Sequence, residues 1–307
     1  MKALILGVLS ILVCGVSSQE SSSEQYFTLF SWCLAPPYIE ENLQNRWWNF
    51  GGDALMEVNR FVRLTPELPS KSGWLWSKQP FTSSSWLVEF DFKVHGASSG
   101  LHGDGFAFWY TTDKEQGGPV YGSKDQFTGL GVFFDTYANG RHKFSFPYVN
   151  AMIGDGKTKY DHANDGVTNQ IGGCSVDFRQ KDVATKARIK YYKDDMVEVS
   201  LNYKGDDTWE QCFTKYNVSL PTHGYLGFSA FTGDVSDNHD IITITTKGIT
   251  NPSHSRPEHS QQNLVNKSSG GAWHYFTILL SLTIFAVVCY GIWVVLRMRE
   301  ERSFKRF

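Results

Sequence analysis

Residues 86–94 read WLVEFDFKV, a stretch in which apolar and charged side chains alternate. Successive side chains of an extended chain point to opposite faces, so one face here carries only apolar groups. That face holds Trp86, Val88, Phe90, Phe92 and Val94, while the other holds Glu89, Asp91 and Lys93. The alternation is typical of a β-strand with one face in a hydrophobic core and the other in water.

Further strand patterns lie on both sides of this segment. Apolar positions in 187–191 and 197–203 flank the polar residues 193–195, which predicts an antiparallel hairpin. More apolar strands are expected at 105–110, 129–135, 224–230 and 241–246. Helical periodicity is not sustained between the two ends of the chain. Many strands without crossover helices predict an all-β protein, an antiparallel two-sheet β-sandwich.

The two ends of the chain carry membrane-targeting patterns. Lys2, the apolar run to Val13 and small residues up to Ser18 predict a cleaved signal peptide at 1–18. Residues 276–296 hold no charged side chain and are long enough to cross a hydrocarbon core of about 30 Å as a transmembrane helix. Basic residues follow, so the tail 297–307 is predicted to be cytosolic. This type I arrangement leaves a lumenal domain at 19–248 and a polar, flexible stalk at 249–275.

Charge and sequons agree with a lumenal domain. The net charge is −2 and basic residues cluster only in the tail, which argues against a nucleic-acid partner. Asn217-Val-Ser219 and Asn266-Lys-Ser268 are glycosylation sequons, which a lumenal location would expose to modification.

Three cysteines lie in the predicted lumenal region: Cys33, Cys174 and Cys212. An odd number in an oxidising compartment allows one disulfide and leaves one thiol. The position of Cys33 near the mature terminus favours Cys174 with Cys212, although the sequence alone does not fix the connectivity.

Four loop segments are rich in side-chain oxygen: residues 102–105, 135–139, 160–166 and 232–235. Each one alone has the composition of an ordinary loop. In 135–139, however, the Asp135 carboxylate, the Tyr137 carbonyl and the Asn139 amide follow a buried strand and can meet at one hard cation. Asp165 can add a second carboxylate. Calcium takes about six to eight oxygen ligands, so these loops predict a Ca²⁺ site.

Other metal sites fit the sequence less well. Residues 155–161 place lysines where an EF-hand needs oxygen ligands, and they lack flanking helices. His102 and His162 have no Cys or His partner at the spacing of a zinc site.

Asp104 and His162 are candidate contacts for a polar ligand. Asp104 lies between two glycines, which lets its carboxylate stand clear of the backbone. Ionised, it can accept strong hydrogen bonds from paired sugar hydroxyls. A single histidine is more often structural, but His162 comes three residues before the candidate ligand Asp165.

Together these segments resemble the legume-type (L-type) lectins, and in particular the vesicular integral-membrane lectins that carry glycoproteins between endoplasmic reticulum and Golgi. The resemblance covers residues 25–248 and extends to the short stalk, the span and the basic tail. It rests on LHGDGFAFWY (101–110), GVFFDTYAN (131–139), YDH and DG (160–166), GGC and DFR (172–179) and TGDVSDNH (232–239).

The resemblance implies a non-enzymatic sandwich that binds Ca²⁺ and high-mannose N-glycans in loops at its concave side. Calcium would be held by Asp135, the Tyr137 carbonyl, Asn139 and Asp165. The implied mannose contacts are Ser70, Asp104, Tyr137, Asn139, His162, Gly233, Asp234 and Val235. The family usually has leucine where Val235 stands, a change that a main-chain contact tolerates. A cis peptide bond is expected between Gly103 and Asp104.

The resemblance also bears on assembly and location. It assigns Cys174 and Cys212 to the family disulfide and leaves Cys33 as a buried thiol or a link between chains. The stalk is short and lacks heptads, which favours a monomer. Lys305, Arg306 and Phe307 resemble trafficking signals through which such proteins contact vesicle coats, in membranes of the endoplasmic reticulum, the intermediate compartment or the Golgi. A basic tail can also do no more than set topology.

Two rival classes of protein fit the same fold. A retaining glycoside hydrolase needs two carboxyl groups about 5 Å apart, and Glu89 with Asp91 is the best pair. Hydrolases of this fold add a glutamate on the same strand at a position that is Val94 here, which argues against hydrolysis. A structural adhesion ectodomain would leave the oxygen-rich loops unexplained.

Overall fold

The computed structural model describes residues 24–41, 43–97 and 100–250, and also residues 281, 283–288, 290–295 and 297. The first group of ranges forms fifteen strands and two short 3-10 helices. The strands are β1 (Gln25–Thr28), β2 (Trp48–Gly52), β3 (Leu55–Glu57), β4 (Phe61–Thr65), β5 (Ser72–Ser77), β6 (Trp86–His95), β7 (Gly105–Thr111), β8 (Thr128–Asp135), β9 (Tyr148–Asp155), β10 (Gly172–Ser175), β11 (Thr185–Tyr192), β12 (Met196–Asn202), β13 (Glu210–Tyr216), β14 (Tyr225–Phe231) and β15 (Asn238–Thr250), and the helices are η1 (Phe30–Trp32) and η2 (His162–Asn164).

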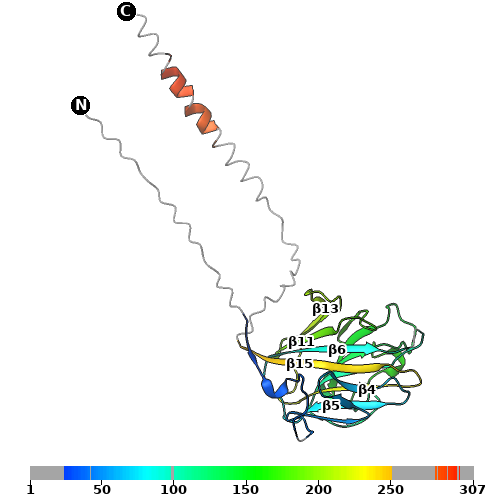
Figure 1. The fold of residues 1–307 in the computed structure, drawn as a ribbon. Coiled ribbons are helices and arrows are strands. Elements are labelled where there is room, and N and C mark those ends of the chain that lie inside the picture. The colour runs from blue at the N-terminus through cyan, green and yellow to red at the C-terminus, as the bar shows by residue number, and fades with distance from the viewer. Residues whose placement is uncertain are drawn as a thin grey trace, which may run out of the picture. The chain divides into compact units, whose positions relative to one another are not determined.

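The strands form two sheets, and every pairing of named strands is antiparallel. Sheet A has the order β13-β12-β11-β6-β15-β4-β3, with β1 added beside β15. Sheet B has the order β10-β9-β8-β7-β14-β5-β2. In Figure 1, β11, β6, β15 and β4 run side by side across sheet A. The predicted all-β two-sheet sandwich is therefore confirmed.

The strand patterns in the sequence correspond to observed strands. Along β6 the positions from Val88 to His95 alternate between buried and partly exposed, as the WLVEFDFKV stretch predicts. β11 and β12 form the predicted hairpin, with Tyr192 opposite Met196 across the turn. Sequence reasoning did not place β1 to β5, β9, β10 or β13, which are short or lack a sustained alternation.

Two of the three hydrophobic clusters among the described residues bear on the predicted site. The larger lies between the sheets and includes Phe90 of β6, Phe108 of β7 and Phe134 of β8. The smaller includes Phe133 of β8, whose side chain points to the opposite face from that of Phe134. In this second cluster Phe133 packs with Tyr121 and Tyr160 from loops, so loops cover the outer face of sheet B.

A disulfide joins Cys174 of β10 to Cys212 of β13. β10 and β13 are edge strands of sheets B and A, so the bridge ties the two edges together. This is the pairing that the resemblance implies. Cys33 is a free, partly buried thiol, and burial raises its pKa.

The last strand extends past the predicted domain boundary at residue 248. β1 pairs with the end of β15, placing Tyr26 opposite Ile249 and Gln25 opposite Thr250. This pairing keeps Ile249 and Thr250 in the strand, and both residues therefore belong to the sandwich rather than to the stalk.

Several predicted segments lie outside the described residues: the signal peptide 1–18, the stalk from 251 to 275 with Asn266, and the tail from 298 to 307 with Lys305, Arg306 and Phe307. Residues 281, 283–288, 290–295 and 297 are helical. Among the residues that the structure describes, no helix is both long and apolar enough to cross a membrane.

Candidate functional site

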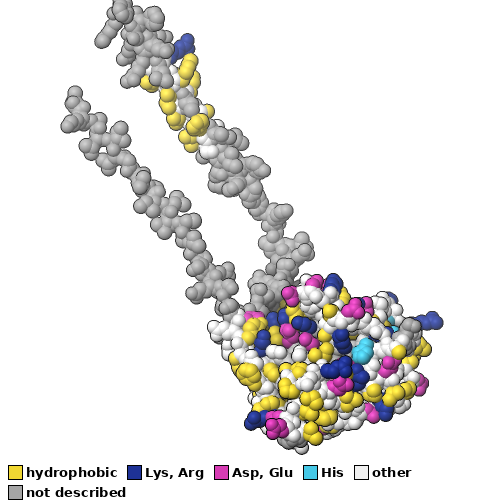
Figure 2. Space-filling view, viewed as in Figure 1, with side chains coloured by type: hydrophobic (Ala, Val, Ile, Leu, Met, Phe, Trp, Pro, Cys, Tyr) yellow, Lys and Arg dark blue, Asp and Glu magenta, His cyan; other side chains and the backbone are white. Residues whose placement is uncertain are grey.

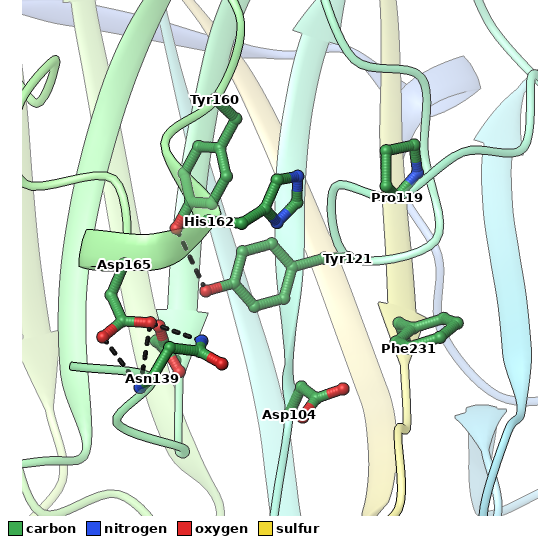
Figure 3. A pocket seen from close by; sticks show the side chains of 9 residues that line it. Asp104, Pro119, Tyr121, Asn139, Tyr160, His162, Asp165 and Phe231 are labelled. Carbon is green, nitrogen blue, oxygen red and sulfur yellow. Dashed lines mark hydrogen bonds between the residues drawn. The ribbon is translucent and has the colours of Figure 1, made fainter.

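A cavity of about 150 Å³ lies at the loop-covered side of sheet B. It brings together five of the predicted site residues from separate strands and loops: Asp104, Asp135, Asn139, His162 and Asp165. Pro119, Tyr121, Tyr160 and Phe231 complete its lining. Figure 3 shows the side chains that line this space, with Tyr160, His162, Tyr121, Asn139 and Asp165 close together and Asp104 near Tyr121.

Asp135 ends β8 and is almost fully buried, with 2% of its surface exposed. Its Oδ1 accepts a hydrogen bond from the Tyr137 amide at 3.0 Å. Among the described residues, no hydrogen-bond partner lies within ordinary bonding distance of its buried Oδ2. Burial, with the nearby charge of Asp165, raises the pKa of Asp135 well above its usual range. A buried carboxylate oxygen without a partner is costly for the folded state, and a bound cation would satisfy it.

Asp165 follows η2 in a left-handed conformation, with φ of 51°, and is 1% exposed. Asn139 donates to its carboxylate twice, from the backbone N at 3.0 Å and from Nδ2 at 2.5 Å. His142 Nε2 lies 2.6 Å from the same carboxylate, and Asn150 Nδ2 donates to the Asp165 carbonyl at 2.7 Å. The amide oxygen of Asn139 faces away from Asp165, toward the cavity (Figure 3). The two predicted oxygen ligands are thus held in place by fixed neighbours.

Asp104 lies directly before β7 and lines the cavity across from Asp165. The Gly103–Asp104 peptide bond is cis, as expected from the resemblance. Burial raises the pKa of Asp104 from 3.8 to about 6. A Cβ atom at Gly233 would lie 3.1 Å from Asp104 Oδ2, so the 232–235 loop approaches the Asp104 carboxylate closely and a side chain at Gly233 would make that contact tight. Asp104 therefore lies between the candidate calcium ligands and the 232–235 loop.

The remaining predicted sugar contacts flank the cavity and do not line it. Ser70 donates its backbone N–H to the Gly233 carbonyl at 2.9 Å, which joins the two loops. A Cβ atom at Gly103 would lie 2.8 Å from Tyr137 Cβ and 3.1 Å from Val235 Cγ2, so both residues pack against Gly103, next to Asp104. Asp234 is exposed to solvent.

Sequence reasoning gave no role to several residues of the site. Tyr121 and Tyr160 place their hydroxyls 3.3 Å apart, and the ring of Phe133 packs against both. His142 contacts Asp165 directly. Because Tyr121 and Tyr160 come from different loops, no local spacing indicates their pairing. Neither loop is rich in aromatic residues, so the sequence carries no signal for this pair.

The rival sites are not supported by the geometry. Among the described residues, no group of three or more His, Cys, Asp or Glu side chains is placed to hold a metal ion, so a cation at this cavity needs amide and carbonyl oxygens as well as carboxylates. The hydrolase candidate Glu89 is hydrogen-bonded to Arg188 at 2.9 Å. Val94 is buried in the core, where a third acidic residue would be required.

A sandwich whose covered sheet carries an oxygen-lined loop cavity is the architecture of a lectin domain. The family model described as "Legume-like lectin family" matches residues 25–256, and the chain belongs to this family. Vesicular integral-membrane protein VIP36 of Mus musculus is 37% identical over 284 residues, which cover 85% of this chain and 78% of that protein.

Solved structures agree with this assignment. The crystal structure of the VIP36 exoplasmic/lumenal domain in its Ca²⁺/Man2-bound form is 38% identical, has a TM-score of 0.69, and covers 76% of this chain and 93% of that chain. Its metal-free form is 39% identical with a TM-score of 0.68, covering 72% and 92%. These relatives are named as lectins or vesicular integral-membrane proteins and not as enzymes, in agreement with the prediction that the chain is not an enzyme.

Proposed function

We propose that the chain is a calcium-dependent lectin that binds high-mannose N-glycans on glycoproteins of the secretory pathway. One observation carries the proposal: the orphaned, buried Asp135 oxygen shares a cavity with Asp165, Asn139 and Asp104. Such a cluster is unfavourable by itself, and a divalent cation would neutralise it beside groups suited to sugar hydroxyls.

Calcium would be held by Asp135, Asp165, the Asn139 amide oxygen and the Tyr137 carbonyl. A bound ion would supply the positive charge that keeps both carboxylates ionised, and Asn139 would be held by its contacts to the ion and to Asp165. Support comes from the related VIP36 domain, whose crystal structures include Ca²⁺-bound and metal-free forms.

Mannose would be contacted by Asp104, Asn139 and His162, which line the cavity. Tyr137 and the 233–235 loop would bound the sugar at the rim, since they pack around Gly103 and Asp104. Ser70 would join them there, because its backbone N–H is bonded to the Gly233 carbonyl. The Ca²⁺/Man2-bound and Ca²⁺/Man3GlcNAc-bound forms of VIP36 support this class of ligand. The raised pKa of Asp104 indicates that its charge is held at a cost, which an incoming pair of hydroxyl donors would offset.

The proposed role in the cell is a cargo receptor of type I topology in the early secretory pathway. In this proposal the chain has a signal peptide at 1–18, a stalk and a membrane span at 276–296. Its tail carries Lys305, Arg306 and Phe307 as a trafficking signal for coat proteins. A monomeric state and glycans on Asn217 and Asn266 belong to the same proposal. The name of the vesicular integral-membrane relative supports this organisation.

A glycan array tests the proposal. The full chain, purified in detergent, is applied with millimolar calcium and again with excess chelator. We expect signal on high-mannose glycans with calcium only. Binding that survives the chelator, or that favours glycans without terminal mannose, would contradict it.

A further inference from the structure

The outer face of sheet A carries a second cavity, of about 620 Å³, which shares no lining residue with the first. Figure 2 shows Lys and Arg side chains gathered over this face beside a histidine. The lining residues are Glu57, Arg60, Phe61, Arg63, Lys93, His95, Lys181, Asp240 and Ile242, and we call this surface the cationic groove.

The groove is locally electropositive in a chain of net charge −2. Its lining holds four Lys or Arg side chains and two carboxylates, so four minus two leaves a charge of +2 with His95 neutral. A patch whose sign opposes that of the whole molecule attracts anions at short range.

Arg63 is a fixed donor at the centre of the groove. Its Nε and Nη2 donate to the two oxygens of Asp240 at 2.7 and 2.8 Å, and its guanidinium lies 4.5 Å from the centre of the Phe61 ring. Asp240 is 3% exposed and also lies 3.0 Å from His95 Nε2, so its charge is fully engaged. Among the described residues Arg63 Nη1 has no hydrogen-bond partner, which leaves two N–H groups for an incoming acceptor.

The other cations are weakly held. Arg60 pairs with Glu57 at 3.0 Å, but their side chains are 71% and 42% exposed, and Lys181 pairs with the exposed Asp177. Exposed pairs of this kind contribute about 0–1 kcal/mol, so an incoming carboxylate can replace the partner. Within the part of the chain that the structure describes, Lys93 donates only to the carbonyl of Asp182. Three flexible cations therefore surround one fixed arginine.

The groove extends across neighbouring strands. The register places Lys93 of β6, Asp240 of β15 and Arg63 of β4 in one row, and Glu57 lies on the adjacent β3. Four strands about 4.8 Å apart span roughly 14 Å, whereas alternate side chains of an extended peptide repeat every ~6.7 Å. An extended peptide with acidic side chains at alternate positions can thus meet several cations together, while a lone phosphate or sulfate meets one end.

We propose that the cationic groove binds an extended acidic peptide segment of a partner protein, independently of the glycan cavity. Arg63 makes the fixed contact, and Arg60, Lys93 and Lys181 pair with carboxylates on either side. Both faces of the lectin domain then take part in recognition, one through sugar and the other through charge.

Fluorescence anisotropy tests the proposal with a labelled peptide of about eight residues that alternates glutamate with serine. The full chain in detergent is compared with the Arg60→Glu/Lys181→Glu variant, which changes an exposed arginine and a partly exposed lysine and leaves the Arg63–Asp240 pair intact. Lys215→Glu is the matched control, because Lys215 is exposed on β13 at the far edge of the same sheet.

We expect the double variant to weaken peptide binding at least tenfold and Lys215→Glu to change it less than twofold. A glutamine version of the peptide should not bind, and raising the salt from about 0.05 to 0.3 M should weaken the acidic peptide through screening. Equal losses in both variants would overturn the proposal. So would inorganic phosphate binding as tightly as the peptide, or anionic vesicles binding while the peptide does not.

Discussion

The outer faces of sheets A and B differ in how much of them is exposed to solvent. Along β6 of sheet A, buried core positions alternate with partly exposed Glu89, Asp91 and Lys93. In sheet B every residue of β7 is buried, and so is every residue of β8 after Thr128. The difference arises because loops bearing Tyr121 and Tyr160 pack on sheet B and build a second core there.

The covered face is also where a demanding polar site can form. Asp135 keeps an unsatisfied buried oxygen beneath these loops, whereas Glu89 on the open face pairs with Arg188 in contact with water. In the low dielectric of the covered site, the buried Asp135 carboxylate destabilises the fold when no cation is bound, and it binds a cation strongly when one is present. The open face carries instead the exchangeable charges of the cationic groove. The fold thus separates a recessed cation and sugar site from a surface that recognises charge.

Removing the support of the second core should have the largest effect. Phe133→Ala deletes a ring 4.8 Å from Tyr160 and 5.4 Å from Tyr121, and we expect a loss of about 3–5 kcal/mol in the free energy of unfolding. Calcium affinity should fall as well, because both tyrosines line the cavity.

Phe108→Ala is the matched control, since Phe108 lies in the core between the sheets. Urea unfolding should show a similar loss of stability, while calorimetry should show calcium affinity near that of the wild type. Equal losses of calcium affinity in both variants would mean that the second core has no special role.

Asp104→Asn should remove glycan binding with the fold intact. Loss of a charged acceptor is expected to weaken mannoside binding about 100-fold, or about 2.7 kcal/mol. Its raised pKa means that Asp104 contributes stability below its unfolded pKa of 3.8, a contribution lost as the pH rises through about 6. At pH 7.4 in chelator the variant should therefore be as stable as the wild type or slightly more stable. A large drop in melting temperature would show that Asp104 has a structural role.

Acidification should destabilise the fold through His239, which is buried on β15 in sheet A. Burial lowers its pKa from 6.5 to about 3, so the folded protein keeps it neutral while the unfolded chain binds a proton below pH 6.5. The contribution is present above pH 6.5 and is lost as the pH falls toward 3, at up to about 1.4 kcal/mol per pH unit. Between pH 7.4 and 5.5 the loss should be about 1 kcal/mol.

Urea unfolding of the wild type and His239→Gln at both pH values isolates this effect, because other titrating groups cancel in the difference. Between pH 7.4 and 5.5 the free energy of unfolding of the variant should fall by about 1 kcal/mol less than that of the wild type. An identical pH dependence in the two proteins would rule out His239 as its source.

A change on the open face should have the smallest effect. Arg188 bonds Glu89 at 2.9 Å and lies 3.8 Å from the centre of the Trp209 ring, with both charged side chains partly exposed. Arg188→Ala should cost about 1 kcal/mol or less and leave mannoside affinity unchanged. A change in glycan binding would show coupling between the faces that the structure does not predict.

The strands of the open face could be predicted from the sequence more completely than those of the covered face. The open face of β6 leaves its alternation visible in residues 86–94, so the sandwich could be inferred from sequence. The doubly covered β7 and β8 read only as apolar runs, and nothing local indicates that Phe133 faces loops while Phe134 faces sheet A.

The site was predictable only in part for a related reason. Asp135 and Asn139 are near in sequence, and their oxygen chemistry indicated a cation. Oxygen chemistry in the next long loop also indicated Asp165 as a second carboxylate. The approach of Asp104 to these residues depends on sheet order, and only the resemblance supplied it. Tyr121, His142 and the cationic groove depend on contacts between distant segments, which no spacing in the sequence reveals.

The central claim is that calcium at Asp135 and Asp165 assembles a mannose site. Calorimetric titration of the full chain with a mannose disaccharide at pH 7.4, with calcium and then with chelator, tests it most directly. We predict binding in the micromolar to millimolar range with calcium and none with chelator, and Asp135→Asn in calcium should behave as the wild type does in chelator. Equal affinity under all three conditions would contradict the account.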